Sequence, residues 1–133
     1  MKLAIVIAAV VIVLGGVFAI TKGEKASTDK PTLTFKTIQS DIATGGQLLD
    51  VRTPEEYAES HINGAVNIPL QDMKVGVMPS SSKEKPLYVY CRSGNRSAES
   101  TKILESAGYQ KVIDLGAMPY VQSIGGTIKS KEK

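Results

Sequence analysis

The strongest constraint on the fold is a short apolar run at 87–90, Leu-Tyr-Val-Tyr, which leads through Cys91 and a glycine-containing turn into a helix-like segment ending near Gly108. A β-rich run that passes through a short turn into a helix is typical of α/β domains. Such a turn points backbone N–H groups and the positive end of the helix dipole toward its centre. We therefore expect an anion-binding loop at the end of this strand, with Cys91 at its start.

The residues after Cys91 favour a reactive thiol. Arg92 and Arg96 follow within five residues, and positive charge beside a cysteine stabilises its thiolate. The alternative is that a single cysteine is a small buried hydrophobe. That role does not account for two arginines, which are costly to bury without partners. Because Cys91 is the only cysteine, the chain can form neither an intramolecular disulfide nor a cysteine-based metal cluster.

The rest of residues 32–126 alternates short apolar runs with helix-like segments. This alternation predicts an α/β domain whose mostly parallel central sheet is covered by helices on both faces. On helix 96–107 we expect Ala98, Thr101, Leu104 and Ala107 to share one face. The sequence predicts strands at 33–35, 47–52, 65–68, 87–90 and 112–115, and helices at 37–44, from 54, at 70–74, at 96–107 and at 118–123.

Polar residues close to these elements are further candidates. Thr53 as N-cap and Glu56 three residues later predict a capping box, with Pro54 at the first helical position. Asp50 and Arg52 end an apolar run, and we expect them to hold loops near the site through charge-assisted hydrogen bonds. His61, the only histidine, precedes a turn at 62–64 and is a candidate base or a structural residue.

The N-terminal segment differs from the rest of the chain. Residues 3–20 carry no charge and as a helix span about 27 Å, close to the thickness of a bilayer core. This pattern predicts an uncleaved anchor or a signal peptide with a cleavage site near Ala19, with a buried strand-like segment as a further alternative. We expect export to the periplasm or cell envelope, although the lysines at 22, 25 and 30 oppose the positive-inside pattern. Residues 21–31 are polar and predict a tether.

Composition excludes several function classes. The net charge is +3, and no basic stripe with interleaved aromatic residues is present, so we expect no nucleic-acid partner. The sequence contains no metal-ligand cluster, no glycine-rich nucleotide loop and no Ser-His-Asp arrangement, so we expect no metal and no cofactor. We expect a monomer, with residues 127–133 forming a basic, solvated tail.

Four blocks of sequence, in order, resemble the single-domain rhodaneses, a family of thiosulfate sulfurtransferase-like proteins. The resemblance spans roughly residues 32–126, and the order of the blocks makes it specific. The blocks are 48–57 (LLDVRTPEEY), 61–69 (HINGAVNIP), 89–97 (VYCRSGNRS) and 115–118 (LGAM).

The resemblance implies a two-step sulfur transfer. Cys91 would take the outer sulfur of an anionic donor such as thiosulfate, form a persulfide, and pass the sulfur to cyanide or a thiol. It also implies that Arg96 closes the loop and that His61 is structural. The implied substrate-binding loop consists of Arg92, Ser93, Gly94, Asn95, Arg96 and Ser97.

Other functions stay open at this point. The chain could be a tethered sulfur carrier whose persulfide comes from a partner protein, or an inactive interaction domain, which would not need Cys91. Related cysteine phosphatases have five residues between cysteine and arginine, whereas four separate Cys91 from Arg96. The smaller loop favours a single sulfur atom over a phosphate. One departure from the family is that no tryptophan is present, although one is often found near the position of Val121.

Overall fold

The computed structural model of the chain describes residues 32–132. The anchor or signal peptide expected at 1–20 and the tether expected at 21–31 lie outside these residues. Within the described part, none of the helices has both the length and the apolar character needed to cross a bilayer.

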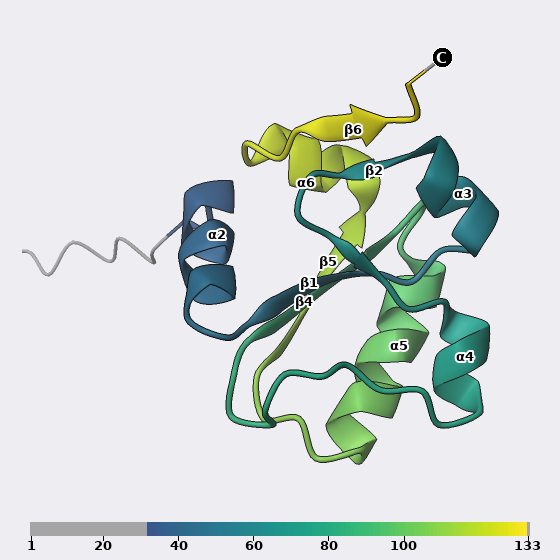
Figure 1. Ribbon diagram of the computed structural model, residues 1–133. Helices are drawn as coiled ribbons and strands as arrows, with labels where there is room; N and C mark the ends of the chain where they lie inside the picture. The colour runs from purple at the N-terminus through teal and green to yellow at the C-terminus, as the bar shows by residue number, and fades with distance from the viewer. Residues whose placement is uncertain (1–31, 133) are drawn as a thin grey trace, which may run out of the picture. The chain divides into compact units, whose positions relative to one another are not determined.

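A four-stranded, all-parallel sheet forms the centre of the domain (Figure 1). Its order is β3-β1-β4-β5, so β4, the strand that ends in Cys91, is an interior strand. Every residue of β4 is buried, as expected for an apolar strand covered on both faces. The strands are β1 (Gln47–Asp50), β3 (Val66–Asn67), β4 (Leu87–Cys91) and β5 (Val112–Ala117).

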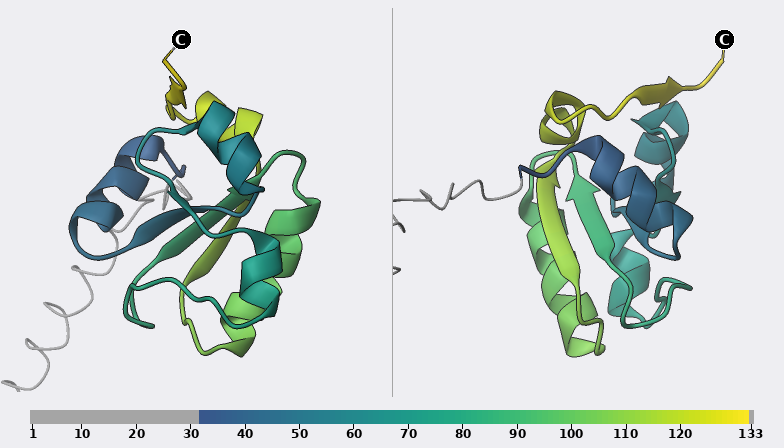
Figure 2. Two further views of the ribbon diagram at one scale, coloured as in Figure 1. Left: turned by 45° about the vertical axis from the view of Figure 1, so that its right-hand side comes forward. Right: turned by 90° about the vertical axis from the view of Figure 1, so that its left-hand side faces the viewer.

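Two helical layers cover the sheet, as the sequence predicts (Figure 2). On one face, α4 (Leu70–Lys74) and α5 (Asn95–Ser106) pack against alternate residues of β1 and β4, including Val89 and Cys91. On the other face, α2 (Phe35–Ala43) and α6 (Met118–Ser123) pack against the intervening residues, including Tyr88 and Tyr90. Because strand side chains alternate, Tyr90 and Cys91 point to opposite faces of the sheet.

A second, two-stranded sheet lies beyond the end of β1. β2 (Ser60–Ile62) pairs antiparallel with β6 (Ile128–Ser130). The sequence predicts a turn beginning near His61 and a solvated tail at 127–133. Residues 127–132 are exposed, but residues 128–130 pair through their backbone as a strand. The short helix α3 (Pro54–Glu59) leads directly into β2.

Local sequence signals placed most elements correctly. The capping box of Thr53 and Glu56 is present, and Gly108 follows α5 with a positive φ of 97°. The strand expected at 33–35 is wrong, because Phe35 begins α2 under the N-cap Thr34. The predicted face of α5 is also offset, since Ala98 is exposed while Ser97, Ser100 and Leu104 are buried. Small serines allow this helix to lie close to the sheet.

Candidate active site

Cys91 is the last residue of β4 and lies at the carboxyl edge of the sheet. It pairs with Ala117 of β5, and its side chain belongs to the core face covered by α5. The residue is fully buried as a free thiol. In parallel α/β sheets this edge is where ligands bind, because the loops that follow the strands converge there.

The chain turns sharply after Cys91 and begins α5 at Asn95. Gly94 makes this turn with a φ of 102°, a conformation that L side chains adopt rarely. Its backbone N–H donates to Cys91 Sγ at 2.9 Å. A Cβ atom at Gly94 would meet Gly116 Cα at 3.8 Å, an ordinary contact, so it is the positive φ that calls for glycine here. Glycine therefore lets the loop fold tightly over the sulfur.

Hydrogen bonds set the ionisation of the thiol. Burial acts to raise the pKa of Cys91, but the polar groups around the sulfur, which are the N–H and hydroxyl of Ser97 and the N–H groups of Gly94 and Ser93, outweigh it and lower the pKa below its usual value. Donors directed at a sulfur stabilise its anion over its neutral form. The arrangement favours the thiolate of Cys91.

Ser97 also connects the loop to the next strand. Its hydroxyl lies 2.9 Å from the carbonyl oxygen of Gly94 and 3.5 Å from that of Gly116. The side chain is completely buried in the first turn of α5. By contrast, Arg92, Ser93 and Asn95 are exposed to solvent. Ser97 thus supports the loop from below while these three residues form its outer surface.

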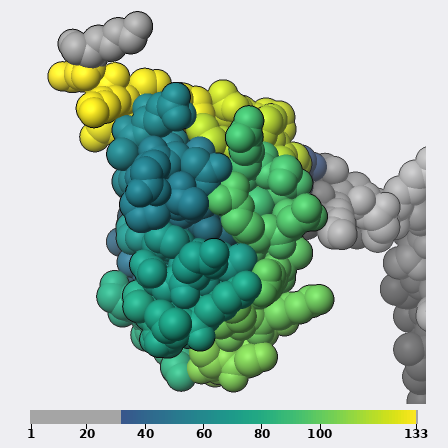
Figure 3. Space-filling model, turned by 90° about the vertical axis from the view of Figure 1, so that its right-hand side faces the viewer, coloured from purple at the N-terminus to yellow at the C-terminus, as the bar shows by residue number. Residues whose placement is uncertain are grey.

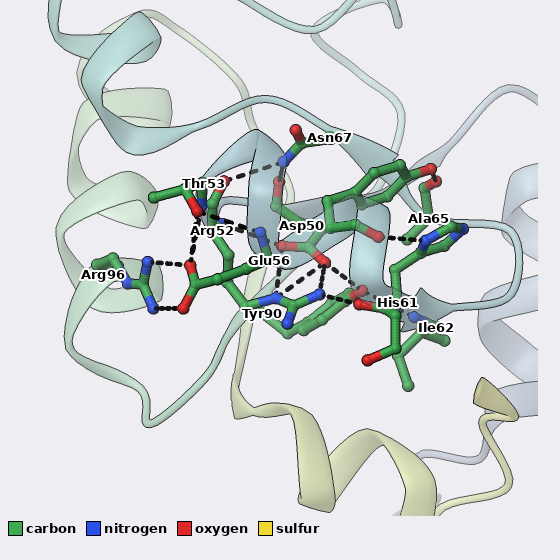
Figure 4. Close-up of polar contacts among 12 residues, drawn as sticks. Asp50, Arg52, Thr53, Glu56, His61, Ile62, Ala65, Asn67, Tyr90 and Arg96 are labelled. Carbon is green, nitrogen blue, oxygen red and sulfur yellow. Dashed lines mark hydrogen bonds and ion pairs between the residues drawn. The ribbon is translucent and has the colours of Figure 1, made fainter. Parts of the chain in front are cut away.

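Arg96 is held by a carboxylate from a distant part of the chain (Figure 4). Its Nη1 and Nη2 donate to Glu56 of α3 at 2.7 and 3.1 Å. The hydrogen bonds from Arg96, aided by the capping-box bond from Thr53 and opposed by burial, lower the pKa of Glu56 to about 2. Arg96 therefore fastens α3 to the start of α5, across the edge of the sheet.

A buried polar network lies on the opposite face of the sheet (Figure 4). Nε and Nη2 of Arg52 donate to the carboxylate of Asp50, with the shortest contact at 2.6 Å, and Nη2 also donates to the carbonyl of Ser60 at 2.6 Å. The hydroxyl of Tyr90 donates to Asp50 at 2.7 Å and accepts from the N–H of Ile62 at 3.0 Å. These are the charge-assisted bonds expected for Asp50 and Arg52, and they join β1, β2 and β4.

His61 lies in β2, where it contacts α3 rather than the cysteine loop. Its ring stacks on Tyr57 with centroids 3.8 Å apart, and its Nδ1 lies 2.8 Å from the Tyr57 carbonyl oxygen. A carbonyl accepts only, so Nδ1 carries a proton. Tyr57 in turn donates its hydroxyl to the carbonyl of Ala65 at 2.7 Å. These contacts fit the structural alternative for His61.

A cleft of about 420 Å³ lies beside the loop. It is bordered by Arg92, which follows Cys91, and by Met118, which follows the strand partner of Cys91. Figure 3 shows this side of the molecule, with the dark-teal surface of α3 next to the green surface of the loop region. The complete lining is Arg52, Glu56, Glu59, Ser60, Arg92, Met118, Pro119 and Gln122.

Sequence reasoning missed two residues of this region. The sequence predicts Glu56 only as part of the capping box, whereas its Oε2 accepts from both Thr53 and Arg96. The sequence predicts Tyr90 only as a residue of an apolar strand, whereas its hydroxyl donates to Asp50. No local signal connects Glu56 to Arg96, which is 40 residues away. At the position of the family tryptophan, Val121 is fully buried in the core beside α2.

Among residues 32–132, no group of three or more His, Cys, Asp or Glu side chains is arranged to hold a metal ion. The described part of the chain provides a stabilised thiolate near a cleft that is lined in part by arginine side chains.

Known proteins resemble the part of the chain that contains this site. The family model for the rhodanese-like domain matches residues 34–117. The chain is 38% identical over 80 residues to the thiosulfate sulfurtransferase PspE of Escherichia coli, an alignment that covers 56% of this chain and 77% of that protein. Several further relatives are longer, and the chain spans only 18% and 48% of two of them.

Solved structures show the same fold. The Alr3790 protein from Anabaena sp. superposes with a TM-score of 0.62 at 25% identity, over 74% of this chain and 80% of that one. A rhodanese with anions from E. coli gives a TM-score of 0.53 at 32% identity, over 64% of this chain and 98% of that one. Because the family model matches residues 34–117, more than half of the sequence, the chain belongs to the family of rhodanese-like domains.

Proposed function

We propose that the protein moves a sulfane sulfur from thiosulfate, or a related donor, to cyanide or a thiol through a persulfide on Cys91. In the first step the Cys91 thiolate attacks the outer sulfur of thiosulfate. A new S–S bond forms, the old S–S bond breaks, and sulfite leaves with the electron pair. In the second step the acceptor attacks the outer sulfur of the persulfide, and the electron pair of that S–S bond returns to Cys91.

The observation that carries this proposal is the hydrogen bond from the Gly94 N–H to Cys91 Sγ at 2.9 Å, within a loop that lowers the pKa of the thiol. A thiolate is the nucleophilic form of cysteine. The same donors can stabilise the anionic persulfide, since its charge is close to the same position. The loop can therefore stabilise negative charge both on the Cys91 thiolate and on the persulfide that forms from it.

The arginines of the loop support an anionic donor in different ways. Arg92 is exposed and has no ion-pair partner among residues 32–132, so its charge is available to attract thiosulfate. Both terminal nitrogens of Arg96 are bound to Glu56. We therefore assign donor attraction to Arg92 and loop closure to Arg96, with Asp50, Arg52 and His61 in supporting roles.

We further propose a monomer that acts in the periplasm or cell envelope, attached to the inner membrane or released from it. The uncharged stretch at residues 3–20 supports this location. Cell fractionation of the full chain, followed by mass spectrometry of its N-terminus, tests it. A soluble cytoplasmic protein with an intact Met1 would contradict it.

The test of sulfur transfer is the intact mass of the full chain before and after incubation with thiosulfate, and again after addition of cyanide. We expect the mass of one added sulfur atom, mapped to Cys91 and removed by cyanide. Cys91→Ser should fold, as checked by circular dichroism, but gain no sulfur. If the folded wild type gains no sulfur from thiosulfate but accepts it from a persulfide-bearing protein, the chain is a sulfur carrier instead.

A further inference from the structure

The unexplained feature near the site is a nitrogen of Arg52. Nε and Nη2 make all the hydrogen bonds of the side chain, to Asp50 and Ser60, while no residue in the range 32–132 accepts from Nη1 (Figure 4). The side chain is only 7% exposed, yet it lines the cleft beside the cysteine loop. Nη1 is not among the buried atoms that lack a partner, so it is open to the cleft and its donors are available to a ligand.

The surroundings of Nη1 indicate what kind of acceptor would fit. The Asp50 carboxylate holds the guanidinium in one orientation, so little conformational entropy is lost when an anion binds. Arg92, on the same cleft, adds a second positive charge. Glu56 is already paired with Arg96, which leaves Glu59 as the cleft carboxylate without an ion-pair partner among the described residues. The cleft therefore favours a ligand with one carboxylate over a ligand with two.

The position of the cleft suits the second step of sulfur transfer, in which the acceptor attacks the persulfide. Arg92 and Met118 lie one residue from Cys91 and from its strand partner Ala117, so the cleft opens at the edge where the sulfur is held. Cys91 itself is fully buried. In a persulfide the outer sulfur lies about 2 Å from Sγ, so an acceptor does not have to reach Sγ itself. Met118 and Pro119 provide apolar contact for a short alkyl chain.

We propose that this cleft is the acceptor subsite, and that Nη1 of Arg52 together with Arg92 binds the carboxylate of a small monocarboxylate thiol. The inference rests on the proposed function. The thiolate of the bound acceptor attacks the outer persulfide sulfur, the S–S bond to Cys91 breaks, and its electron pair returns to the Cys91 thiolate. The acceptor leaves as a persulfide anion, so charge and electrons balance without an oxidant.

Binding is tested on the resting protein, without any sulfur loading. The probes are 3-(methylthio)propionate and the uncharged 2-(methylthio)ethanol, added to full-length protein labelled at its methionine methyl groups. We expect the acid to shift the NMR signal of Met118 at concentrations where the alcohol does not, with buried Met73 unaffected as an internal reference. Equal shifts from both probes, or no shift of Met118, would overturn the assignment whatever happens with thiosulfate.

Turnover is tested on persulfide-loaded protein. After loading is verified by mass, discharge by 3-mercaptopropionate should be about tenfold faster than discharge by 2-mercaptoethanol at equal thiolate concentration, as a charge-assisted hydrogen bond predicts. Gln122→Glu places a carboxylate in the cleft and should reduce this ratio at least threefold. Gln110→Glu makes the same change at an exposed position before β5 begins, at the opposite edge of the sheet, and should leave the ratio unchanged.

The outcomes separate the two proposals. If no sulfur is loaded, the proposed function fails, while the binding experiment still decides the subsite. If sulfur is loaded but the two thiols discharge it equally, or both glutamate variants reduce the ratio to the same extent, the acceptor subsite is wrong and sulfur transfer stands.

Discussion

Two arginine–carboxylate pairs stand at the same edge of the sheet and differ in almost every physical respect. Arg52 and Asp50 are two residues apart, and their side chains are 7% and 0% exposed. Arg96 and Glu56 are 40 residues apart, and their side chains are 32% and 27% exposed. The first pair is embedded in the core with Tyr90, whereas the second bridges α3 and α5 at the surface.

The two pairs have different roles, because one stabilises the fold and the other positions the loop. A buried pair is already desolvated, so removal of one partner leaves an uncompensated charge in the core. A partly exposed ion pair contributes less to the stability of the fold, because water screens its charges and competes for its hydrogen bonds. We infer that Asp50 and Arg52 mainly determine stability, while Glu56 and Arg96 mainly determine the position of the loop that carries Cys91.

The largest effect is expected from Asp50→Asn, which keeps the shape of the side chain but removes its charge. Arg52 and the Tyr90 hydroxyl then lose a buried anionic acceptor. We expect the free energy of unfolding, measured with urea, to fall by about 3 to 5 kcal/mol. The double variant Asp50→Asn, Arg52→Met should regain part of this loss. A fall below about 1 kcal/mol would show that the buried pair does not stabilise the fold.

A smaller effect is expected from Glu56→Gln. The ion pair to Arg96 is lost at the half-exposed site, and we expect the free energy of unfolding to fall by about 1 kcal/mol at neutral pH. Loading of Cys91 from thiosulfate should slow more than this loss of stability explains, because Arg96 no longer fixes the start of α5. Glu55→Gln is the matched control, since Glu55 is exposed in the same helical turn. Equal slowing in both variants would contradict the assigned role.

The same pair predicts a pH dependence. The pKa of Glu56 is lowered from its ordinary 4.5 to about 2, chiefly by the hydrogen bond from Arg96. A lowered pKa in the folded state stabilises the fold above the ordinary pKa, and the contribution is lost as pH falls through the folded value. The stability gap between wild type and Glu56→Gln should therefore be constant above about pH 5 and close as the pH approaches 2. Urea unfolding at pH 6, 4 and 2.5 tests this, and a gap that stays constant would refute the shift.

The smallest effect on stability is expected from Arg92→Gln, which completes the comparison with an arginine that has no ion-pair partner among the described residues. We expect the free energy of unfolding to change by less than about 0.5 kcal/mol. Loading from thiosulfate should nevertheless slow several-fold at low ionic strength, and less so at high salt. Lys102→Gln removes the same charge from the exposed face of α5 and should leave the loading rate unchanged.

Much of the fold could be predicted because its signals are local. The capping box of Thr53 and Glu56, the glycine after α5 and the apolar run before Cys91 each act within a few residues. The errors came where tertiary packing overrides such signals. Residues 33–35 have strand character, but Phe35 turns inward as part of α2. Ala98 is the more apolar residue, yet Ser97 and Ser100 are the buried ones, and the carbonyl oxygen of Gly94 holds the hydroxyl of Ser97.

The strand, the tight loop and the helix around Cys91 follow from the amino-acid sequence alone, because an apolar run, a glycine at the turn and a helix-like segment act within a few residues of one another. Only the tertiary structure decided what the arginines of the loop do. The parallel order β3-β1-β4-β5 brings the end of β1 beside the end of β4, and so places Glu56 against Arg96 and Asp50 against Tyr90, each 40 residues away. Contacts over such distances depend on sheet order and register, which no local pattern of residues encodes.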